Sequence, residues 1–180
     1  EIRAILGDFF DIVSLREAGV ESDPEETGKT FEENARIKAV AGMKASGMPC
    51  IADDSGLEVL ALDCRPGVMS ARYSGSHGDD AANNEKLLAE LADKPDRSAR
   101  YVCVICMAFP DGRELEARGE CYGEILKEKR GNGGFGYDPL FYFPQFGKTF
   151  AEISSEEKNE VSHRGKAMRL LMEYLHHEEN

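Results

Sequence analysis

The nine residues from Tyr101 to Phe109, YVCVICMAF, are apolar almost throughout. A short continuous apolar run of this kind is typical of a strand buried on both faces, so it predicts a central place in a sheet. Pro110-Asp111-Gly112 follows as a turn signal. From Leu115 to Gly123, apolar or small residues then alternate with mostly charged ones, which predicts a half-exposed strand. Together the two segments predict an antiparallel pair.

Three further segments carry helix signals. Thr30 and Glu33 form a capping-box pattern that predicts a helix from residue 31, and Gly47 and Pro49 predict its end near Ser46. Residues 79–93 place leucines on one helical face. A C-terminal helix is predicted by an apolar stripe at helical spacing, made of Ala167, Leu170, Leu171, Tyr174 and Leu175.

The rest of the chain adds shorter elements. Residues 1–7 predict a helix, 9–15 (FFDIVSL) a short strand, 21–28 an acidic loop, and 50–52 a strand leading into an acid pair. The whole pattern predicts one mixed α/β domain over residues 1–180, with a partly antiparallel sheet and flanking helices.

Composition narrows the class of function. The chain has 180 residues, of which 41% are hydrophobic and 31% charged, which is typical of a soluble globular protein. No apolar run approaches the roughly 18 residues that a membrane span needs, so we expect no membrane partner. The net charge is −12 and no long basic stripe is present, so we expect no nucleic-acid partner. An anionic ligand would need local basic groups, backbone N–H groups or a metal.

The chain contains five cysteines, an odd number without the spacing of a disulfide framework. This usage fits a reducing compartment, so we expect a cytoplasmic location. Cys103 and Cys106 lie within the apolar run, where a spacing of three in a strand directs them to opposite faces. We interpret both as small core residues rather than as zinc or redox ligands.

An acid pair, Asp53-Asp54, stands within IADDSGL. In an extended chain the two carboxylates point to opposite sides, so that one can face a cleft while the other supports the turn. Neighbouring like charges cost free energy unless a cation or hydrogen-bond donors compensate them. Mg²⁺ favours one or two carboxylates together with phosphate oxygens. The alternative is a solvated strand end with a turn.

Two more segments suggest a ligand site. Asn34 and Lys38 share one helix face, with Glu26 in the loop before the helix; the alternative is a solvated face. The second segment is residues 130–139, RGNGGFGYDP. Its glycines allow a ligand to approach the backbone closely, and Phe135 or Tyr137 could stack on a base. The alternative is a mobile hairpin loop.

The segment 158–166, KNEVSHRGK, contradicts ordinary helix rules. Ser162 is a good N-cap residue, but His163, Arg164 and Gly165 then fill the first turn. Cations at a helix N-terminus oppose the macrodipole by about 0.3–1 kcal/mol, and glycine costs roughly 1 kcal/mol relative to alanine. Donors at this position suit an anion or a carbonyl acceptor. The alternative is a tolerated surface turn.

Several of these segments occur together in one known family. The stretches EETGKTFEENARIKA, ADDSGLEVLAL, PGVMSARYSG, GGFGYDPLF and EEKNEVSHRGKA follow one another between residues 25 and 167. In this order they resemble the inosine triphosphate pyrophosphatase-like family, the non-canonical purine NTP pyrophosphatases, in its bacterial dITP/XTP branch. The resemblance implies an elongated, two-lobed α/β fold with a central cleft, and a homodimer.

The resemblance also implies a reaction and a set of site residues. The reaction is the Mg²⁺-dependent hydrolysis of ITP, dITP or XTP to monophosphate and pyrophosphate, which cleans the nucleotide pool. Asp54 matches the catalytic and metal-binding residue, Asp53 and Glu26 match its acidic metal partners, and Lys38 matches a phosphate contact. The remaining matches are substrate contacts: Ser55, Phe135, Gly136, Tyr137, Asp138, Lys158, His163 and Arg164.

Two departures from the family are visible. The family opens with a strand and a Ser/Thr-x-Asn-x-x-Lys loop, whereas this chain begins in the helix that follows, so we expect native residues upstream of residue 1. Asp63-Cys64 stand where the family tends to have glycines, which predicts a local loop change. Two alternatives stay open: a related pyrophosphatase for pyrimidine or modified-base triphosphates, and a non-catalytic nucleotide-binding module.

Overall fold

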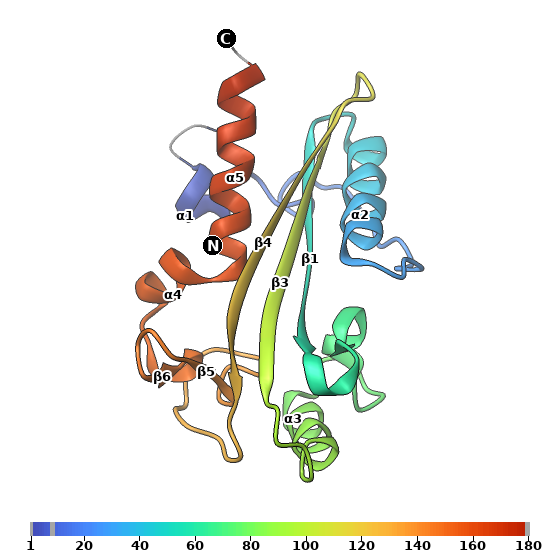
Figure 1. The fold of residues 1–180 in the computed structure, drawn as a ribbon. Coiled ribbons are helices and arrows are strands. Elements are labelled where there is room, and N and C mark those ends of the chain that lie inside the picture. Colours follow the sequence, from blue (N-terminus) through green and yellow to red (C-terminus); the bar gives the residue numbers. More distant parts are fainter. Residues whose placement is uncertain (1, 8–9, 179–180) are drawn as a thin grey trace. The chain divides into compact units, whose positions relative to one another are not determined.

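A computed structural model of the chain describes residues 2–7 and 10–178, and in this part six strands form one sheet in the order β2-β1-β3-β4-β5-β6 (Figure 1). The strands are β1 (Cys50–Val59), β2 (Arg65–Pro66), β3 (Ser98–Ala108), β4 (Glu114–Ile125), β5 (Phe141–Phe143) and β6 (Lys148–Thr149). The β1–β2, β4–β5 and β5–β6 pairs are antiparallel. The predicted mixed α/β fold with flanking helices is therefore confirmed.

Along the chain, helices precede, separate and follow the strands. They are α1 (Ile2–Leu6), α2 (Phe31–Ser46), α3 (Asp80–Glu90), α4 (Ser155–Val161) and α5 (His163–Glu178), with short 3-10 helices η1 (Leu60–Leu62), η2 (Gly67–Arg72) and η3 (Phe150–Glu152). Among the residues that the structure describes, no helix is both long enough and apolar enough to cross a membrane.

The β3–β4 pair is the hairpin that the sequence predicts. Every residue of β3 from Tyr101 to Ala108 is buried, and β3 lies between two long strands. The Phe109 N–H donates to the Arg113 carbonyl at 2.9 Å, which closes the turn. In β4, the residues on one side are buried and their neighbours are more exposed, so the period-two pattern is confirmed.

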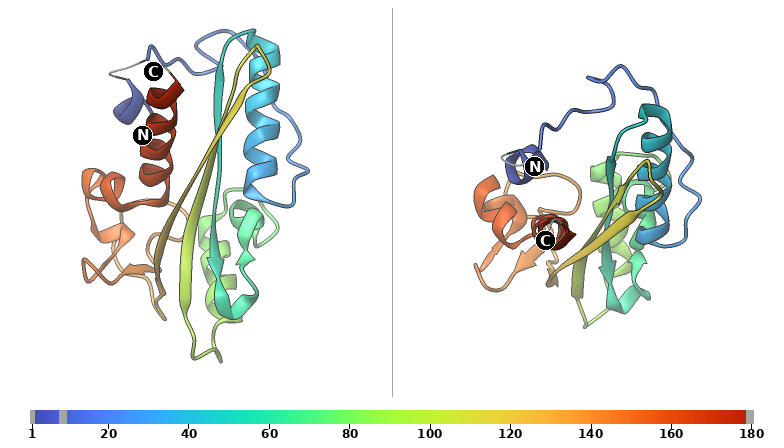
Figure 2. Two further views of the ribbon diagram at one scale, coloured as in Figure 1. Left: turned by 45° about the horizontal axis from the view of Figure 1, so that its top comes forward. Right: turned by 90° about the horizontal axis from the view of Figure 1, so that it is seen from above.

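The chain divides into two compact units. The first comprises the described residues within 1–54, 103–119 and 163–180. In this unit α2 and α5 cover opposite faces of the strands (Figures 1 and 2). On one face, Cys103 and Ile105 of β3 form a core cluster with Met168 and Leu171 of α5. The layers follow from the strand period, because alternate side chains of one strand face different helices.

On the other face, ion pairs join β4 to α2. Arg36 binds Glu114 and Arg118 binds Glu32, each with its shortest N–O distance at 2.6 Å. Gly119, on the α5 side of β4, allows a close approach between strand and helix. A Cβ built on Gly119 would lie 2.1 Å from the His163 carbonyl oxygen. The beginning of α5 therefore packs directly on the β4 backbone.

The second unit comprises Ser55–Val102 and Glu120–Ser162. Its core is aromatic: the ring centroids of Tyr101 and Phe141 are 4.5 Å apart, and those of Phe141 and Phe150 are 4.9 Å apart. Leu87 and Leu91 of the α3 segment are fully buried in the same cluster. This core fixes the positions of α3 and of the loop that ends at β5.

Some local expectations are wrong. A strand is predicted for residues 9–15, of which Phe9 lies outside the described residues. Residues 10–15 form no strand. A strand needs a neighbouring strand to share its hydrogen bonds, and in the described part none pairs with this segment. β1 does not end at the acid pair but continues to Val59. Thr30 caps α2 as predicted, but Glu33 does not complete the predicted capping box. The Glu33 carboxylate accepts from the Lys29 N–H at 2.6 Å and not from the N–H of Thr30.

The buried stripe of α5 also differs from its prediction. Ala167 and Leu171 are buried as expected, but so are Met168 and Met172, whereas Tyr174 is 38% exposed. Methionine side chains are flexible and fill irregular gaps in a core. Tertiary packing therefore adds Met168 and Met172 to the buried face of α5, which is turned about the helix axis relative to the predicted face. The sequence pattern does not predict α4, β2, β5 and β6, because these elements are too short to show a period.

The two cysteines of the apolar run behave as expected. Cys103 and Cys106 are buried and unbridged. Asp63 and Cys64 have φ values of 53° and 61°, in the left-handed region where glycine is the least strained residue. Both residues lie in a tight turn between η1 and β2, and the local change relative to the family stays a prediction.

Candidate active site

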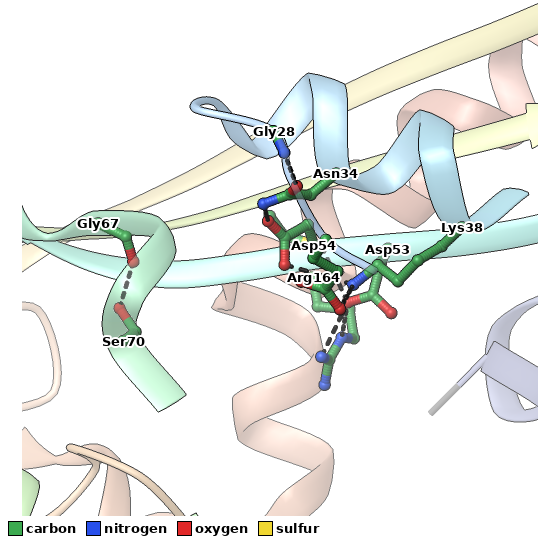
Figure 3. A network of polar contacts seen from close by, with 10 residues as sticks. Gly28, Asn34, Lys38, Asp53, Asp54, Gly67, Ser70 and Arg164 are labelled. Carbon is green, nitrogen blue, oxygen red and sulfur yellow. Dashed lines mark hydrogen bonds and ion pairs between the residues drawn. The ribbon is translucent and has the colours of Figure 1, made fainter. Parts of the chain in front are cut away.

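Asp54 lies on β1 and faces α2. The Asn34 Nδ2 donates to Asp54 Oδ2 at 3.2 Å, and the Lys38 Nζ is 3.4 Å from Asp54 Oδ1 (Figure 3). Lys38 also lies 3.2 Å from a carboxylate oxygen of Glu26. The predicted face of α2 therefore meets Asp54 of the acid pair, and Lys38 lies between the carboxylates of Asp54 and Glu26. The solvated-face alternative is wrong for Asn34, which is fully buried.

The loop before α2 is tied to this cluster. The Gly28 N–H donates to Asn34 Oδ1 at 2.8 Å, while the Asn34 amide group reaches Asp54 (Figure 3). A Cβ on Gly28 would lie 2.5 Å from the same Asn34 oxygen, so the approach requires glycine. The side chain of Asn34 thus links the segment that carries Glu26 to the strand that carries Asp54.

The environment of Asp54 makes its carboxylate more basic. Burial raises the pKa of Asp54 above its ordinary value, and the nearby Glu26 charge raises it further. Lys38 and the hydrogen bond from Asn34 oppose this rise only in part. A carboxylate with a raised pKa accepts a proton more readily from a nearby water molecule, which is the task of a general base.

Asp53 makes different contacts. Nη2 and Nε of Arg164 lie 2.9 Å and 3.2 Å from its Oδ2 (Figure 3). The Cys103 Sγ is 3.8 Å from the same oxygen. The prediction that the two carboxylates point to opposite sides of the strand is confirmed. The structure therefore pairs Asp53, an expected metal ligand, with Arg164, an expected substrate contact. Both of these roles stay predictions.

The first turn of α5 has a physical explanation. Arg164 is a cation at a helix N-terminus, but the Asp53 carboxylate at 2.9 Å offsets its unfavourable interaction with the dipole. Ser162 precedes the helix in an extended conformation, with φ −68° and ψ 160°. His163 and Gly165 are buried, so the alternative of a tolerated surface turn is wrong.

A second cluster lies in the other unit, around Asp138. The Lys158 Nζ is 2.5 Å from Asp138 Oδ2, and both side chains are buried. The Phe135 N–H donates to Asp138 at 3.0 Å, and the Tyr101 hydroxyl is 3.2 Å from the other carboxylate oxygen. The Lys158 ammonium lies 4.4 Å from the centre of the Phe135 ring, which is 59% exposed. An exposed, supported aromatic ring can stack on a flat ligand.

The glycine-rich loop is fastened to its surroundings. The Gly133 N–H donates to the Ala151 carbonyl at 3.1 Å, and the Thr149 hydroxyl donates to the Arg130 carbonyl at 2.8 Å. A Cβ on Gly134 would lie 2.2 Å from an Asp138 oxygen. The glycines thus allow the loop to close around Asp138, which favours a fixed loop over a mobile hairpin.

The two units hold different predicted residues. Glu26, Lys38, Asp53, Asp54, His163 and Arg164 belong to the first unit, and Ser55, Phe135, Gly136, Tyr137, Asp138 and Lys158 to the second. Sequence reasoning missed Tyr101, which looked like an ordinary core residue of a buried strand. The polar residues Asp80 and Asn84 of α3 were also missed, because only the leucines of this helix carry a sequence pattern.

The donor set for a metal is small. Within residues 2–7 and 10–178, no group of three or more His, Cys, Asp or Glu side chains is arranged to hold a metal ion. Asp54 and Glu26, which share Lys38 as a neighbour, are two carboxylates on one side of β1. One or two carboxylates with phosphate oxygens are the usual ligands of Mg²⁺, so these residues fit that ion when a phosphate substrate supplies further oxygens.

Comparison with known proteins identifies relatives across the chain. A dITP/XTP pyrophosphatase of Desulfotalea psychrophila is 59% identical over 169 residues, covering 93% of this chain and 76% of the relative. The dITP/XTP pyrophosphatase of Clostridium perfringens is 50% identical over 184 residues, covering 97% of this chain and 90% of the relative.

Solved structures agree with the sequence comparison. The Ham1 protein of Staphylococcus aureus matches with a TM-score of 0.89 and 47% identity, over 98% of this chain and 91% of that one. A HAM1 protein of Coxiella burnetii matches with a TM-score of 0.91 and 44% identity, over the same shares of the two chains. The model of the Ham1 family matches residues 1–174, and the chain belongs to this family.

Proposed function

We propose that this protein hydrolyses non-canonical purine nucleoside triphosphates, namely dITP, XTP and ITP, to the monophosphate and pyrophosphate. The observation that carries the proposal is the buried Asp54 carboxylate, which Asn34 and Lys38 hold and whose pKa is raised. The names of the relatives, dITP/XTP pyrophosphatases at 59% and 50% identity, supply the substrate class.

The residues of the first cluster supply the hydrolytic chemistry. Water adds to phosphorus while the phosphoanhydride bond between the α- and β-phosphates breaks, and pyrophosphate leaves. Asp54 orients the water and accepts its proton, and the Lys38 ammonium offsets phosphate charge. Asp54 and Glu26 would hold Mg²⁺, which would supply positive charge against the phosphate oxygens. Asp53 stays a predicted third ligand, although its carboxylate is paired with Arg164.

The remaining predicted residues recognise the nucleotide. The exposed Phe135 ring stacks on the base, and Lys158 and Asp138 support that ring and offer polar contacts. Gly136, Tyr137 and Ser55 complete the substrate contacts. His163 and Arg164 supply donors for O6 of a 6-keto purine, whereas adenine has an amino group there and would leave those donors unmatched. Guanine also has O6, so these donors do not explain its rejection.

The cellular setting belongs to the same proposal. The protein acts on free nucleotides in the cytoplasm as a homodimer, and it removes damaged purines before they reach a polymerase. The five unbridged cysteines support a reducing compartment.

A substrate panel tests the proposal. Release of pyrophosphate is measured for ITP, dITP, XTP, the four ordinary dNTPs and a modified pyrimidine triphosphate, each with and without Mg²⁺. We expect ITP, dITP and XTP to be hydrolysed fastest, and only with Mg²⁺. Faster hydrolysis of dTTP or of the modified pyrimidine would assign the protein to the first alternative. Nucleotide binding without any turnover would support a non-catalytic module.

A matched pair of variants tests the base-reading role. Arg164→Ala removes a proposed donor and is expected to raise KM for ITP and XTP more than it lowers the midpoint of unfolding. Arg169→Ala, an exposed arginine further along α5, is the control and should leave KM unchanged. Unaltered kinetics in Arg164→Ala would remove this residue from the set that recognises the base.

A further inference from the structure

Helix α3 holds the loop of Phe135 through the backbone of Gly136. The Gly136 N–H donates to the Asp80 carboxylate at 2.7 Å. The Asn84 amide nitrogen donates to the Gly136 carbonyl at 2.8 Å. Asp80 and Asn84 are one turn apart and so lie on the same face of α3, where they bind both polar groups of one residue.

These two side chains are not needed to form the helix. Asp79 caps α3, because its carboxylate accepts from the Ala82 N–H at 3.0 Å. Asn84 is buried at 2% exposure in the helix interior, where asparagine is a weaker helix former than alanine or leucine. Within the described part of the chain, its carbonyl oxygen Oδ1 is buried without a hydrogen-bond partner, which costs free energy. Because Asn84 is unfavourable for its own helix, we infer that a contact with another segment requires it.

Asp80 and Asn84 fix the conformation of the loop that contains Phe135 and Gly136. Each peptide unit is planar, so fixing the N–H and the C=O of Gly136 fixes the two peptide planes that meet at its Cα. Gly136 has a φ of 60°, and a glycine without such contacts has wide conformational freedom. On the other side of Gly136, the Tyr137 hydroxyl donates to the Ser70 carbonyl at 2.8 Å. The segment from Phe135 to Asp138 is therefore held at successive residues.

We propose that Asp80 and Asn84 are positioning residues that hold Gly136, and with it the Phe135 ring, in the conformation that accepts the purine base. They act through the loop and contact neither the base nor the phosphates. This inference rests on the proposed function, because it assigns the base to the loop that α3 holds. It also explains why Asn84 keeps a buried, unsatisfied oxygen: its nitrogen is bound both to Gly136 and to the Asp80 carbonyl, at 2.6 Å.

The competing explanation is that these contacts only dock α3 against the loop. In that case their loss lowers the stability of the protein and leaves the affinity for the base unchanged. The two explanations differ in which ligand is affected. IMP carries the base, whereas pyrophosphate carries only the phosphate part, so binding of the two products separates a loop effect from general damage.

The test uses Asn84→Ala, Asp80→Ala and the conservative Asp80→Asn, whose side-chain oxygen can still accept from Gly136. Glu85→Ala, an exposed position on the same helix, is the control. We expect the Kd for IMP and the KM for ITP to rise about five- to tenfold in the two alanine variants, as for one lost hydrogen bond. The kcat for ITP and the inhibition constant of pyrophosphate should stay near wild type, and Asp80→Asn should recover most of the affinity for IMP.

The outcomes are distinguishable. If the wild-type protein hydrolyses ITP but both alanine variants bind IMP normally, the inference is wrong and the proposed function stands. Equal weakening of IMP and pyrophosphate would show a purely structural role and would also overturn it. If the wild-type protein neither hydrolyses ITP nor binds IMP, the proposed function fails and the inference fails with it. Because Asp80 is exposed, its variants remain informative even if Asn84→Ala folds poorly.

Discussion

Asp53 and Asp54 are consecutive residues of β1 whose carboxylates bind cations on two different helices. Asp54 lies 3.4 Å from Lys38 of α2, and Asp53 lies 2.9 Å from Arg164 of α5. Successive side chains of a strand point to opposite faces, so one dipeptide serves both helical layers of its unit. The two acids therefore have different partners and, in our proposal, different tasks.

The variant Asp54→Asn is expected to lose turnover by at least about 100-fold, because it removes the proposed general base. The fold should persist. Burial raises the pKa of Asp54, which means that its charged form is disfavoured in the folded state, so a neutral amide should not lower stability at neutral pH. Pyrophosphate release and thermal unfolding measure the two effects, and near-normal turnover would contradict the assigned role.

Asp53→Asn is the matched comparison for Asp54→Asn. It leaves Asp54 in place but weakens the carboxylate partner of Arg164, so we expect a higher KM for ITP with a smaller loss of kcat. The measurement is a full kinetic profile at several Mg²⁺ concentrations. A loss of kcat as deep as that of Asp54→Asn would contradict this expectation, and its reversal by added Mg²⁺ would show that Asp53 acts mainly as the predicted third metal ligand.

The Lys158–Asp138 ion pair is buried, so breaking it should destabilise the protein. Lys158→Met leaves the Asp138 charge without its partner at 2.5 Å, and we expect a loss of about 3–5 kcal/mol in the free energy of unfolding. The double variant Lys158→Met/Asp138→Asn should recover part of this loss, because no unpaired charge remains. Denaturant unfolding of the wild type, Lys158→Met, Asp138→Asn and the double variant forms a double-mutant cycle, and strictly additive effects would contradict the expected coupling.

Gly119→Ala tests the close approach of β4 and α5. The new Cβ would lie 2.1 Å from the His163 carbonyl oxygen and 2.5 Å from the Ala167 nitrogen, both backbone atoms that cannot rotate away. We expect the first turn of α5 to move, with a loss of both stability and ITP turnover. Thermal unfolding and kinetics measure these losses. A variant that keeps wild-type stability and KM would show that α5 can shift without consequence.

Buried tyrosines should make the protein sensitive to alkaline pH. Burial and the hydrogen bond to Glu90 raise the pKa of Tyr73 to about 12 from 10, and burial raises that of Tyr101 well above its ordinary value. A pKa raised in the folded state stabilises the fold fully below the unfolded pKa of about 10, and this contribution is lost as pH rises through the folded pKa. For Tyr73 the window is therefore pH 10 to about 12.

Denaturant unfolding across this window measures the effect, with tyrosinate absorbance as a second signal. Tyr73→Phe removes one of the ionisable groups and should make the loss of stability with pH less steep. An identical pH dependence in wild type and Tyr73→Phe would contradict the prediction.

The sequence determined those features that depend on local pattern. The apolar run before Pro110-Asp111-Gly112 specified a central hairpin, because a strand buried on both faces must be apolar on both. Thr30 and Gly47 specified the ends of α2, because helix ends need capping groups. The spacing of Asn34 and Lys38 placed them on one face, and the strand period separated Asp53 from Asp54. These relationships involve residues a few positions apart.

Only the tertiary structure decided which partners those faces meet. Nothing local to Arg164 indicates a carboxylate 111 positions earlier in the chain, and nothing local to Asn84 indicates the carbonyl of Gly136. The apparent rule-breaking at the start of α5 was visible in the sequence, but its compensation by Asp53 was not. A local pattern fixes how a side chain is directed from its own element. The group that it then binds depends on how strands and helices from distant segments pack, and that packing is a property of the whole chain.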